Sequence, residues 1–500
     1  MVADDDLSDV PAGPVRPDDL TATRRVIEQQ MGGRERVRAL RLAGRRTARD
    51  FVAAFFDDAS FVELGTFAGM ATGAPTTVAG DGRLTGHALL GGHAVGVIVD
   101  DVTVKRATST ALNARKAERV VQLAQRGGMP VLFVGEAAGA RLPETLRGDV
   151  FASEPIYPWL FAPERPPVVA AIVGESYGGS SFVAALADIT VMTKGSVLAI
   201  TSPRVIATAT GEAVTPAALG GADVLAARTD LVDVVVGDDR ELDRVLGLAL
   251  GFFTEPSASG GERPDGDLRA CVPLDPNVAY DVRGVVDAIV DVGSFLELGS
   301  ARGRSIVTGL GRIDGRVVGL LASQPLHEAG ALSPVACEKA ARLTRLCDRF
   351  DFPIVCLVDT PGFQVGVHVE HAGMMRRALE LVGVNTAARV PVVTVILRKA
   401  FGLAFFAMFS PDHGGDVVLA WPGAQIGFMA PTVAANVLFG DEIAAAPTAR
   451  RRALLDERAA ALDASAAVLD VAAAMGIDEI IDVVDTVPLI RQTLDRLCSR

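Results

Sequence analysis

Two short segments of small residues could stabilise a developing negative charge. Gly178-Gly179 follows an apolar run that begins at Val168, and Gly402-Leu403-Ala404 follows a similar run that begins at Val392. Each segment is expected to end a strand and open a helix, where unpaired backbone N–H groups carry partial positive charge. Such donors can hold the oxyanion that forms when a thioester or amide carbonyl reacts. A single turn of this kind would suggest ordinary close packing, but two at matching places predict a pair of oxyanion sites.

A serine beside the first turn suggests a second kind of chemistry. The run Gly174-Glu175-Ser176-Tyr177-Gly178 fits the Gly-x-Ser-x-Gly nucleophile elbow, in which Ser176 would attack an acyl group with a later Asp and His. The second turn places Ala400 opposite Ser176, and the later histidines, at positions 327, 368, 371 and 413, lack a clear strand-to-loop context. The hydrolase is therefore the weaker hypothesis.

Two further segments follow expected strands and carry residues that suit ligand contact. They read Glu-Ala-Ala-Gly-Ala-Arg over 136–141 and Asp-Thr-Pro-Gly-Phe over 359–363. The carboxyl ends of strands are where α/β proteins gather their sites, although such segments also form plain tight turns. Arg141 and the pair Lys105-Arg106 could contact a phosphate, and a solvated surface is the alternative for the pair.

The elements that would position these residues occur twice along the chain. The segment that starts at Pro130 matches the one at Pro353, a shift of 353 − 130 = 223. The segment that starts at Val168 matches the one at Val392, a shift of 392 − 168 = 224. Residues 60–65 match 294–299, a shift of 294 − 60 = 234. A near-constant shift over several segments indicates two copies of one fold.

Apolar periodicity gives both copies alternating strands and helices, which predicts an α/β layered architecture. The first copy has expected strands over 93–100, 130–134 and 167–173 and helices within 24–58, over 113–126 and over 180–186. The second has strands over 317–321, 354–358 and 392–397, helices over 337–349 and after 402, an Ala-rich helix pair over 449–475 and a short tail.

Length and composition bound the domain organisation. A chain of 500 residues is too long for one core, so we expect a disordered tail over 1–22, domains over 23–255 and 269–500, and a polar linker over 256–268. The net charge of −13 argues against nucleic-acid binding. The acidic N-terminus is unlike a signal peptide, and no apolar run is long enough for a membrane span. Neither the five cysteines nor the histidines have metal-ligand spacing, so we expect a cytoplasmic protein without a metal.

Several motifs stand in the order of a known family. They are Gly139-Ala140-Arg141, Gly178-Gly179, Lys339-Ala340-Ala341-Arg342, Asp359-Thr360-Pro361-Gly362-Phe363 and Arg398-Lys399-Ala400-Phe401-Gly402. Over residues 25–490 the chain resembles the carboxyltransferase (β) subunit of biotin-dependent acyl-CoA carboxylases, the acetyl-CoA and propionyl-CoA carboxylase family. The resemblance implies two tandem crotonase-like (ββα-superhelix) domains related by internal duplication.

The resemblance also implies a division of labour between the two domains. The first would bind coenzyme A, and the second domain of a facing subunit would bind carboxybiotin. Gly178 and Gly179 would hold the thioester enolate oxygen, and the amides of Gly402, Leu403 and Ala404 would hold the biotin ureido oxygen. The residues expected to line the substrate sites are Gly139, Ala140, Arg141, Tyr177, Gly362, Phe363, Phe401 and Phe406.

The implied reaction needs no side-chain base, which agrees with the lack of a convincing triad. Carboxybiotin would release CO2 in a dry pocket, the freed ureido nitrogen would take the α proton of the acyl group, and the enolate would attack CO2. Since the chain has no biotin attachment motif and no Gly-rich ATP loop, a biotinylated biotin-carboxylase subunit is the implied partner. The implied assembly is a homo-oligomer, a trimer of dimers of facing subunits.

The chain departs from the family pattern near the second turn. Leu403 stands where the family has a second Gly, and a Leu with positive φ would be strained. Phe406 is a bulky residue at a pocket-lining position. Three alternatives stay open: a crotonase-type decarboxylase that uses only the first site, a non-catalytic scaffold subunit of a carboxylase, which the altered second turn suggests, and the Ser176 hydrolase of the nucleophile-elbow pattern.

Overall fold

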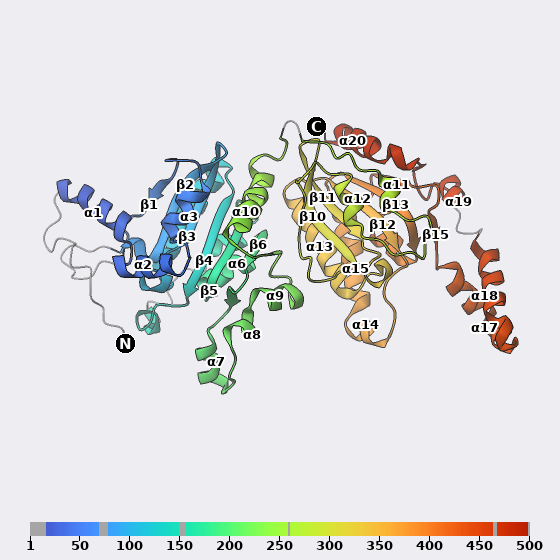
Figure 1. Cartoon of the computed structure of the whole chain (residues 1–500), viewed down its shortest axis with the longest axis horizontal. Helices are drawn as coiled ribbons and strands as arrows, with labels where there is room; N and C mark the ends of the chain where they lie inside the picture. Colours follow the sequence, from blue (N-terminus) through green and yellow to red (C-terminus); the bar gives the residue numbers. More distant parts are fainter. Residues whose placement is uncertain (1–16, 70–78, 150–156, 259–260, 464–467, 499–500) are drawn as a thin grey trace. The chain divides into compact units, whose positions relative to one another are not determined.

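The computed structural model describes the chain except for residues 1–16, 70–78, 150–156, 259–260, 464–467 and 499–500 (Figure 1). Two compact units are present, Met1–Glu255 and Pro256–Arg500. Within the described residues, every helix is too short or too polar to cross a lipid bilayer.

The first unit is built on an eight-stranded sheet in the order β1-β2-β3-β4-β5-β6-β8, with β7 paired to β5. Strands β1 to β3 pair antiparallel and the remaining pairs are parallel. The strands are β1 Val62–Leu64, β2 Arg83–Leu90, β3 His93–Asp100, β4 Val131–Ala138, β5 Val168–Tyr177, β6 Ile189–Thr193, β7 Val197–Ala199 and β8 Val234–Val236.

Its helices surround this sheet. They are α1 Pro17–Gln30, α2 Arg34–Leu42, α3 Ala48–Phe55, α4 Ala111–Gly127, α6 Gly179–Ala185, α7 Pro203–Thr210, α8 Pro216–Gly220, α9 Ala222–Arg228 and α10 Asp239–Thr254, with 3-10 turns η1 Ala79–Gly82, η2 Lys105–Ala107, η3 Glu144–Leu146 and η4 Pro158–Phe161. Helix α4 begins at a capping box between Thr110 and Asn113 and ends at Gly128, whose left-handed φ of 62° suits a glycine. Its stripe of Ala117, Val120 and Val121 is buried in the core.

The second unit repeats this plan with the sheet order β16-β14-β13-β12-β11-β10-β9 and β15 paired to β13. The strands are β9 Leu296–Glu297, β10 Ile306–Ile313, β11 Arg316–Ser323, β12 Ile354–Thr360, β13 Val392–Phe401, β14 Val417–Ala420, β15 Gln425–Gly427 and β16 Glu479–Ile480. The helices are α11 Leu268–Cys271, α12 Arg283–Asp287, α13 Pro334–Arg349, α14 Val367–His371, α15 Met374–Ala387, α16 Leu403–Ala407, α17 Pro431–Ala445, α18 Thr448–Asp463, α19 Val468–Ala473 and α20 Thr486–Leu497, with 3-10 turns η5 Glu328–Gly330 and η7 Val483–Asp485.

The duplication extends to single hydrogen bonds. The Val168 N–H donates to the Asp188 carboxylate over 2.8 Å, and in the second unit the Val392 N–H donates to Asp416 over the same 2.8 Å. The central parallel pair also shifts register at the same point, after Gly135 in one unit and after Val358 in the other. The predicted α/β fold with duplicated crotonase-like domains is therefore confirmed.

Three features differ from the sequence-based expectations. Helix α1 begins at Pro17, inside the segment expected to be disordered, because proline suits the first position of a helix. The expected C-terminal tail forms β16, η7 and α20, and α20 buries Ile490 and Leu494 in the core of the second unit. Strands β5 and β13 run past the apolar residues to Tyr177 and Phe401, because β7 and β15 supply them with parallel partners.

The matched aspartates give a prediction on stability. Asp188 also makes two bonds of 2.7 and 3.0 Å with Arg165 and is nearly buried, whereas Asp416 is exposed. We expect Asp188→Ala to lower the free energy of unfolding by about 3 kcal/mol and Asp416→Ala by about 1 kcal/mol. Urea denaturation followed by circular dichroism measures both, and equal shifts of the midpoint would contradict this account.

Candidate active site

The first candidate donor pair lies where β4 and β5 end. Gly178 has φ 67° and ψ −130°, a conformation that favours glycine, and its N–H donates to the Ile200 carbonyl over 3.1 Å. A Cβ on Gly178 would lie 3.4 Å from the Gly139 Cα and 3.9 Å from the Ala140 nitrogen, so the two loops are in contact. Across the described part of the chain, the N–H groups of Gly179 and Ala140 have no acceptor. Two free donors therefore stand side by side.

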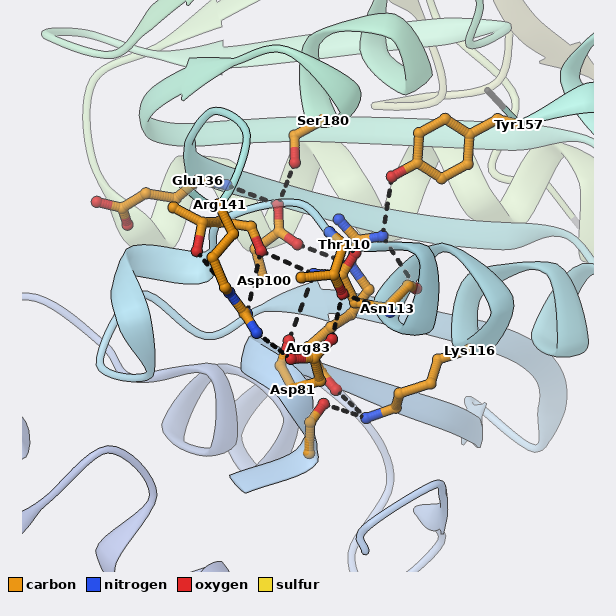
Figure 2. A network of polar contacts seen from close by, with 12 residues as sticks. Asp81, Arg83, Asp100, Thr110, Asn113, Lys116, Glu136, Arg141, Tyr157 and Ser180 are labelled. Atoms are coloured by element: carbon orange, nitrogen blue, oxygen red, sulfur yellow. Dashed lines mark hydrogen bonds and ion pairs between the residues drawn. The ribbon is translucent and has the colours of Figure 1, made fainter. Parts of the chain in front are cut away.

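Arg141 fixes the loop that carries Ala140. Its guanidinium pairs with Asp81 and donates to the Thr108 hydroxyl and carbonyl over 3.0 and 3.2 Å (Figure 2). The backbone of Ser109 bonds on both sides of Ala140, accepting from Arg141 and donating to Gly139. Because its nitrogens are used in this way, the possibility that Arg141 contacts a phosphate does not fit the geometry, and Arg141 orients the loop instead.

A buried polar network lies under the same two loops (Figure 2). Arg83 pairs with Asp100 over 2.8 Å, and both side chains are 0% exposed. The other carboxylate oxygen of Asp100 accepts a 2.6 Å hydrogen bond from the Ser180 hydroxyl, and Arg83 donates to the Tyr157 hydroxyl over 3.1 Å. Burial opposes the charge on Arg83, yet Asp100 and Tyr157 keep the pKa of Arg83 above its ordinary value.

A cavity of about 670 Å³ opens at the same end of the first sheet, lined by residues of α3, β4, β5 and the loops after β3, β6 and β8. Glu136 on its wall pairs with Arg45, and burial raises the pKa of the Glu136 carboxyl against the opposing effect of Arg45. Arg106 and Lys194 also line it, and neither has an acidic partner within the described residues. The cavity therefore offers two exposed cations beside the first turn.

The hydroxyl of Tyr177 stays protonated at neutral pH. Burial, with the Glu175 carboxylate 3.3 Å away, raises the pKa of Tyr177 to about 12.

The second candidate donor pair repeats the geometry of the first within its own unit. Gly402 has φ 63° and ψ −154°, and its N–H donates to the Gly427 carbonyl over 2.9 Å. Leu332 bonds on both sides of Phe363, as Ser109 does around Ala140. A Cβ on Gly362 would lie 3.6 Å from the Phe401 carbonyl oxygen. Among the described residues, no acceptor is bonded to the N–H of Phe363 or Leu403.

The strain expected at Leu403 is absent. Gly402 carries the positive φ, and Leu403 does not belong to the described residues with positive φ. The Leu403 side chain is 63% exposed, and Phe406 on α16 is 37% exposed with its ring 5.0 Å from that of His413. Strain at Leu403 depended on a positive φ there, and this condition is not met because the preceding glycine carries the special conformation.

Ser176 does not have the geometry of a nucleophile. It lies in β5, paired with Ala137 and Leu198, and is 0% exposed. Its hydroxyl has no hydrogen-bond partner in the described part of the molecule. Strand β5 continues to Tyr177, so the sharp turn begins two residues after Ser176. The Ser176 hydroxyl is therefore buried within the strand region and not exposed at the turn.

The structure groups the predicted site residues by unit. Gly139, Ala140, Arg141, Tyr177, Gly178 and Gly179 meet in the first unit, and Gly362, Phe363, Phe401, Gly402, Leu403, Ala404 and Phe406 belong to the second turn and α16. Sequence reasoning missed Arg83, Asp100, Tyr157 and Ser180. An arginine at the start of a buried strand was the available signal, since charged residues are seldom fully buried unless paired.

Comparisons with known proteins agree over almost the whole chain. The family model described as "Carboxyl transferase domain" matches residues 40–496. The chain is 36% identical over 451 residues to the propionyl-CoA carboxylase carboxyltransferase subunit of Haloferax mediterranei, covering 85% of this chain and 86% of that protein. It is 33% identical over 450 residues to the methylmalonyl-CoA decarboxylase subunit alpha of Propionigenium modestum, covering 85% and 86%.

Among solved structures, the chain is similar to the hexameric transcarboxylase 12S core with methylmalonyl-CoA and methylmalonic acid bound. The TM-score is 0.85 at 34% identity, and the match covers 97% of this chain and 95% of that one.

The position of the special turn conformation is testable. Gly402→Ala places a side chain at φ 63° with its Cβ 3.3 Å from the Phe428 carbonyl oxygen, and we expect it to lower the free energy of unfolding by about 2 kcal/mol. Leu403→Ala removes an exposed side chain and should change it by less than about 0.5 kcal/mol. Urea unfolding compares the two, and a larger loss for Leu403→Ala would refute the assignment.

Proposed function

The chain belongs to the carboxyl transferase family of acyl-CoA carboxylases, and we propose that it moves CO2 from carboxybiotin to the α carbon of an acyl-CoA. The observation that carries this proposal is the pair of matched turns, each with two free N–H donors. One pair suits the oxygen of a thioester enolate and the other the ureido oxygen of biotin. Donors fixed in place before the reaction stabilise charge where it develops, by about 3 kcal/mol for each donor.

The residues of the chain have separate roles in this reaction. The N–H groups of Gly178 and Gly402, expected to act as donors, are already bonded to the Ile200 and Gly427 carbonyls. The N–H groups of Ala140 and Gly179 therefore hold the thioester oxygen as it becomes an enolate oxygen, and those of Phe363 and Leu403 hold the ureido oxygen, beside Ala404. Carboxybiotin supplies CO2 and a ureido nitrogen that accepts the α proton. The exposed apolar side chains of Leu403 and Phe406 help to exclude water from that nitrogen and limit the acyl group that fits.

We assign coenzyme A to the cavity of the first unit, with Arg106 and Lys194 as phosphate contacts. The second unit supports this assignment by contrast. Arg398 stands at the position of Gly174, a shift of 398 − 174 = 224, and pairs with Asp359 over 2.7 Å. Its guanidinium also donates to the carbonyls of residues 273, 275 and 278. Arg398 therefore fills the corresponding space in the second unit. In the first unit the Glu136 side chain lies over Gly174, where a Cβ would be 2.4 Å from the Glu136 carboxyl group, and the cavity opens beside them.

A biotinylated biotin-carboxylase subunit is the proposed partner, because the proposed reaction requires carboxybiotin made elsewhere. The relative of known structure forms a hexamer, which supports the proposal that this chain works as an oligomer of facing dimers.

Decarboxylation of an acyl-CoA is the second candidate. It is favoured by the similarity to the methylmalonyl-CoA decarboxylase subunit alpha. The two functions share the enolate site, and this decarboxylase would use that site alone and release CO2 without passing it to biotin. The scaffold hypothesis loses its support because Leu403 is unstrained. The hydrolase hypothesis loses its support because Ser176 is buried.

The proposed function predicts transfer in the reverse direction with the chain alone. Incubated with methylmalonyl-CoA or malonyl-CoA and biocytin, the protein should form propionyl-CoA or acetyl-CoA only when biocytin is present. Gly179→Val should reduce the rate by about 100-fold or more, because its side chain would meet Ser109 and Tyr157 at 3.0 Å. Chromatography of the CoA esters measures both.

Ser176→Ala is the matched control and should keep the activity, since its hydroxyl has no partner within the described residues. Product formed without biocytin would favour the decarboxylase. Loss of activity in Ser176→Ala together with full activity in Gly179→Val would overturn the proposal.

The phosphate contacts give a separate prediction. Arg106→Met should raise KM for the acyl-CoA about tenfold with little change in kcat, because the removed ion pair is the same in the ground and transition states. With an acyl pantetheine thioester, which lacks the nucleotide, the variant and the wild type should have equal KM. An equal rise of KM for both substrates would place the phosphates elsewhere.

A further inference from the structure

The ion pair between Arg83 and Asp100 distinguishes the first unit from the second. The two residues are cross-strand partners in β2 and β3, and the equivalent partners in β10 and β11 are Ile306 and Ser323. The shift is 306 − 83 = 323 − 100 = 223. Because the second unit forms the same sheet with an apolar residue and a serine at this place, the ion pair is not a requirement of the fold.

Asp100 connects the two segments that carry the free donors of the first unit. One of its carboxylate oxygens accepts from the Ser180 hydroxyl over 2.6 Å and from the Glu136 N–H over 3.3 Å. Ser180 directly follows Gly179, and Glu136 lies in β4, which leads into the loop of Ala140. A single oxygen therefore ties the Gly179 turn to the Ala140 loop. In the second unit Ala404 stands at the position of Ser180, a shift of 404 − 180 = 224, and cannot form such a bond.

Arg83 neutralises the negative charge of the Asp100 carboxylate. A lone carboxylate beside the donors would oppose the negative charge that they have to hold, and at a few ångströms in a buried place that repulsion is large. Arg83 balances the charge and donates to the Tyr157 hydroxyl, which lies against Gly179: a Cβ there would be 3.0 Å from that oxygen. The network thus contacts Gly179 from two sides.

We propose that Arg83, Asp100 and Ser180 are positioning residues that set the spacing of the Ala140 and Gly179 N–H donors. This inference rests on the proposed function, in which these donors hold the enolate oxygen. Donor placement matters strongly, since a misplacement of about 1 Å costs about 100-fold in rate. The second unit has no counterpart of this link, which indicates that the more demanding charge develops in the first unit.

The test replaces the network by the residues of the second unit. The triple variant Arg83→Ile, Asp100→Ser, Ser180→Ala removes a buried ion pair without leaving a lone charge, a change that is often neutral for stability. We expect a urea midpoint near that of the wild type, KM for the acyl-CoA within about twofold, and kcat in the biocytin assay lower by about 100-fold. Ser180→Ala alone should lower kcat about tenfold.

Thr190→Val is the matched control. It removes a 2.8 Å hydrogen bond to the Ala184 carbonyl at the opposite end of α6 and should leave kcat unchanged. Unchanged kcat in a folded triple variant, or a loss confined to KM, would overturn the proposal. If the triple variant does not fold, kcat and KM of Ser180→Ala decide: unchanged kcat, or a loss confined to KM, would overturn the proposal.

Hydrogen exchange separates this inference from the proposed function. Peptides that cover residues 178–186 should exchange faster in Ser180→Ala than in the wild type, whereas Thr190→Val should affect only the far end of the helix. An inactive wild type would refute the proposed function, and the exchange rates would still decide the network: equal exchange in Ser180→Ala and wild type would refute the positioning role.

Discussion

An unpaired backbone N–H in a packed turn is costly, and both units keep one at the same place. Each turn starts with a glycine in a conformation that side chains avoid, and the N–H of that glycine bonds to a neighbouring strand or loop, at Ile200 or at Gly427. The next N–H is then directed away from all described acceptors. The extended strands β5 and β13, the loops around Ala140 and Phe363 and the short helices α6 and α16 all serve to hold that donor in place. The proposed chemistry depends on this constraint.

Both units have the free N–H donors at the turn, and they differ in the side chains that lie beneath and beside these donors. In the first, Gly174 and Glu136 line a cavity, and a buried ion pair lies beneath the turn. In the second, Arg398 fills the corresponding space and binds the chain before α12 through three carbonyls. Duplication thus preserved the backbone geometry, whereas the side chains beside the two turns differ. In the proposed function, this difference suits the two copies to two unlike ligands.

The sequence was most informative for features that residues close together in the chain determine. Apolar runs located β3, β4, β5, β12 and β13, and the constant shift revealed the duplication and the paired turns. The polar ends of β5 and β13 could not be predicted, because their pairing with the short strands β7 and β15 forms only in the folded chain. The Arg83 network was missed for the same reason: its members lie on β2, β3, η4 and α6 and meet only in the folded state. Arg141 looked like a free cation until Asp81 and Thr108 were seen to hold it.

The backbone of Leu403 has a wider consequence. Because Gly402 and not Leu403 adopts the disfavoured conformation, position 403 can accept any side chain other than proline and still present its N–H. A residue at the mouth of the second site can therefore change in size and polarity without cost to the main chain. Evolution can vary the entrance independently of the donor behind it, so relatives with the same amide geometry are free to admit different partners.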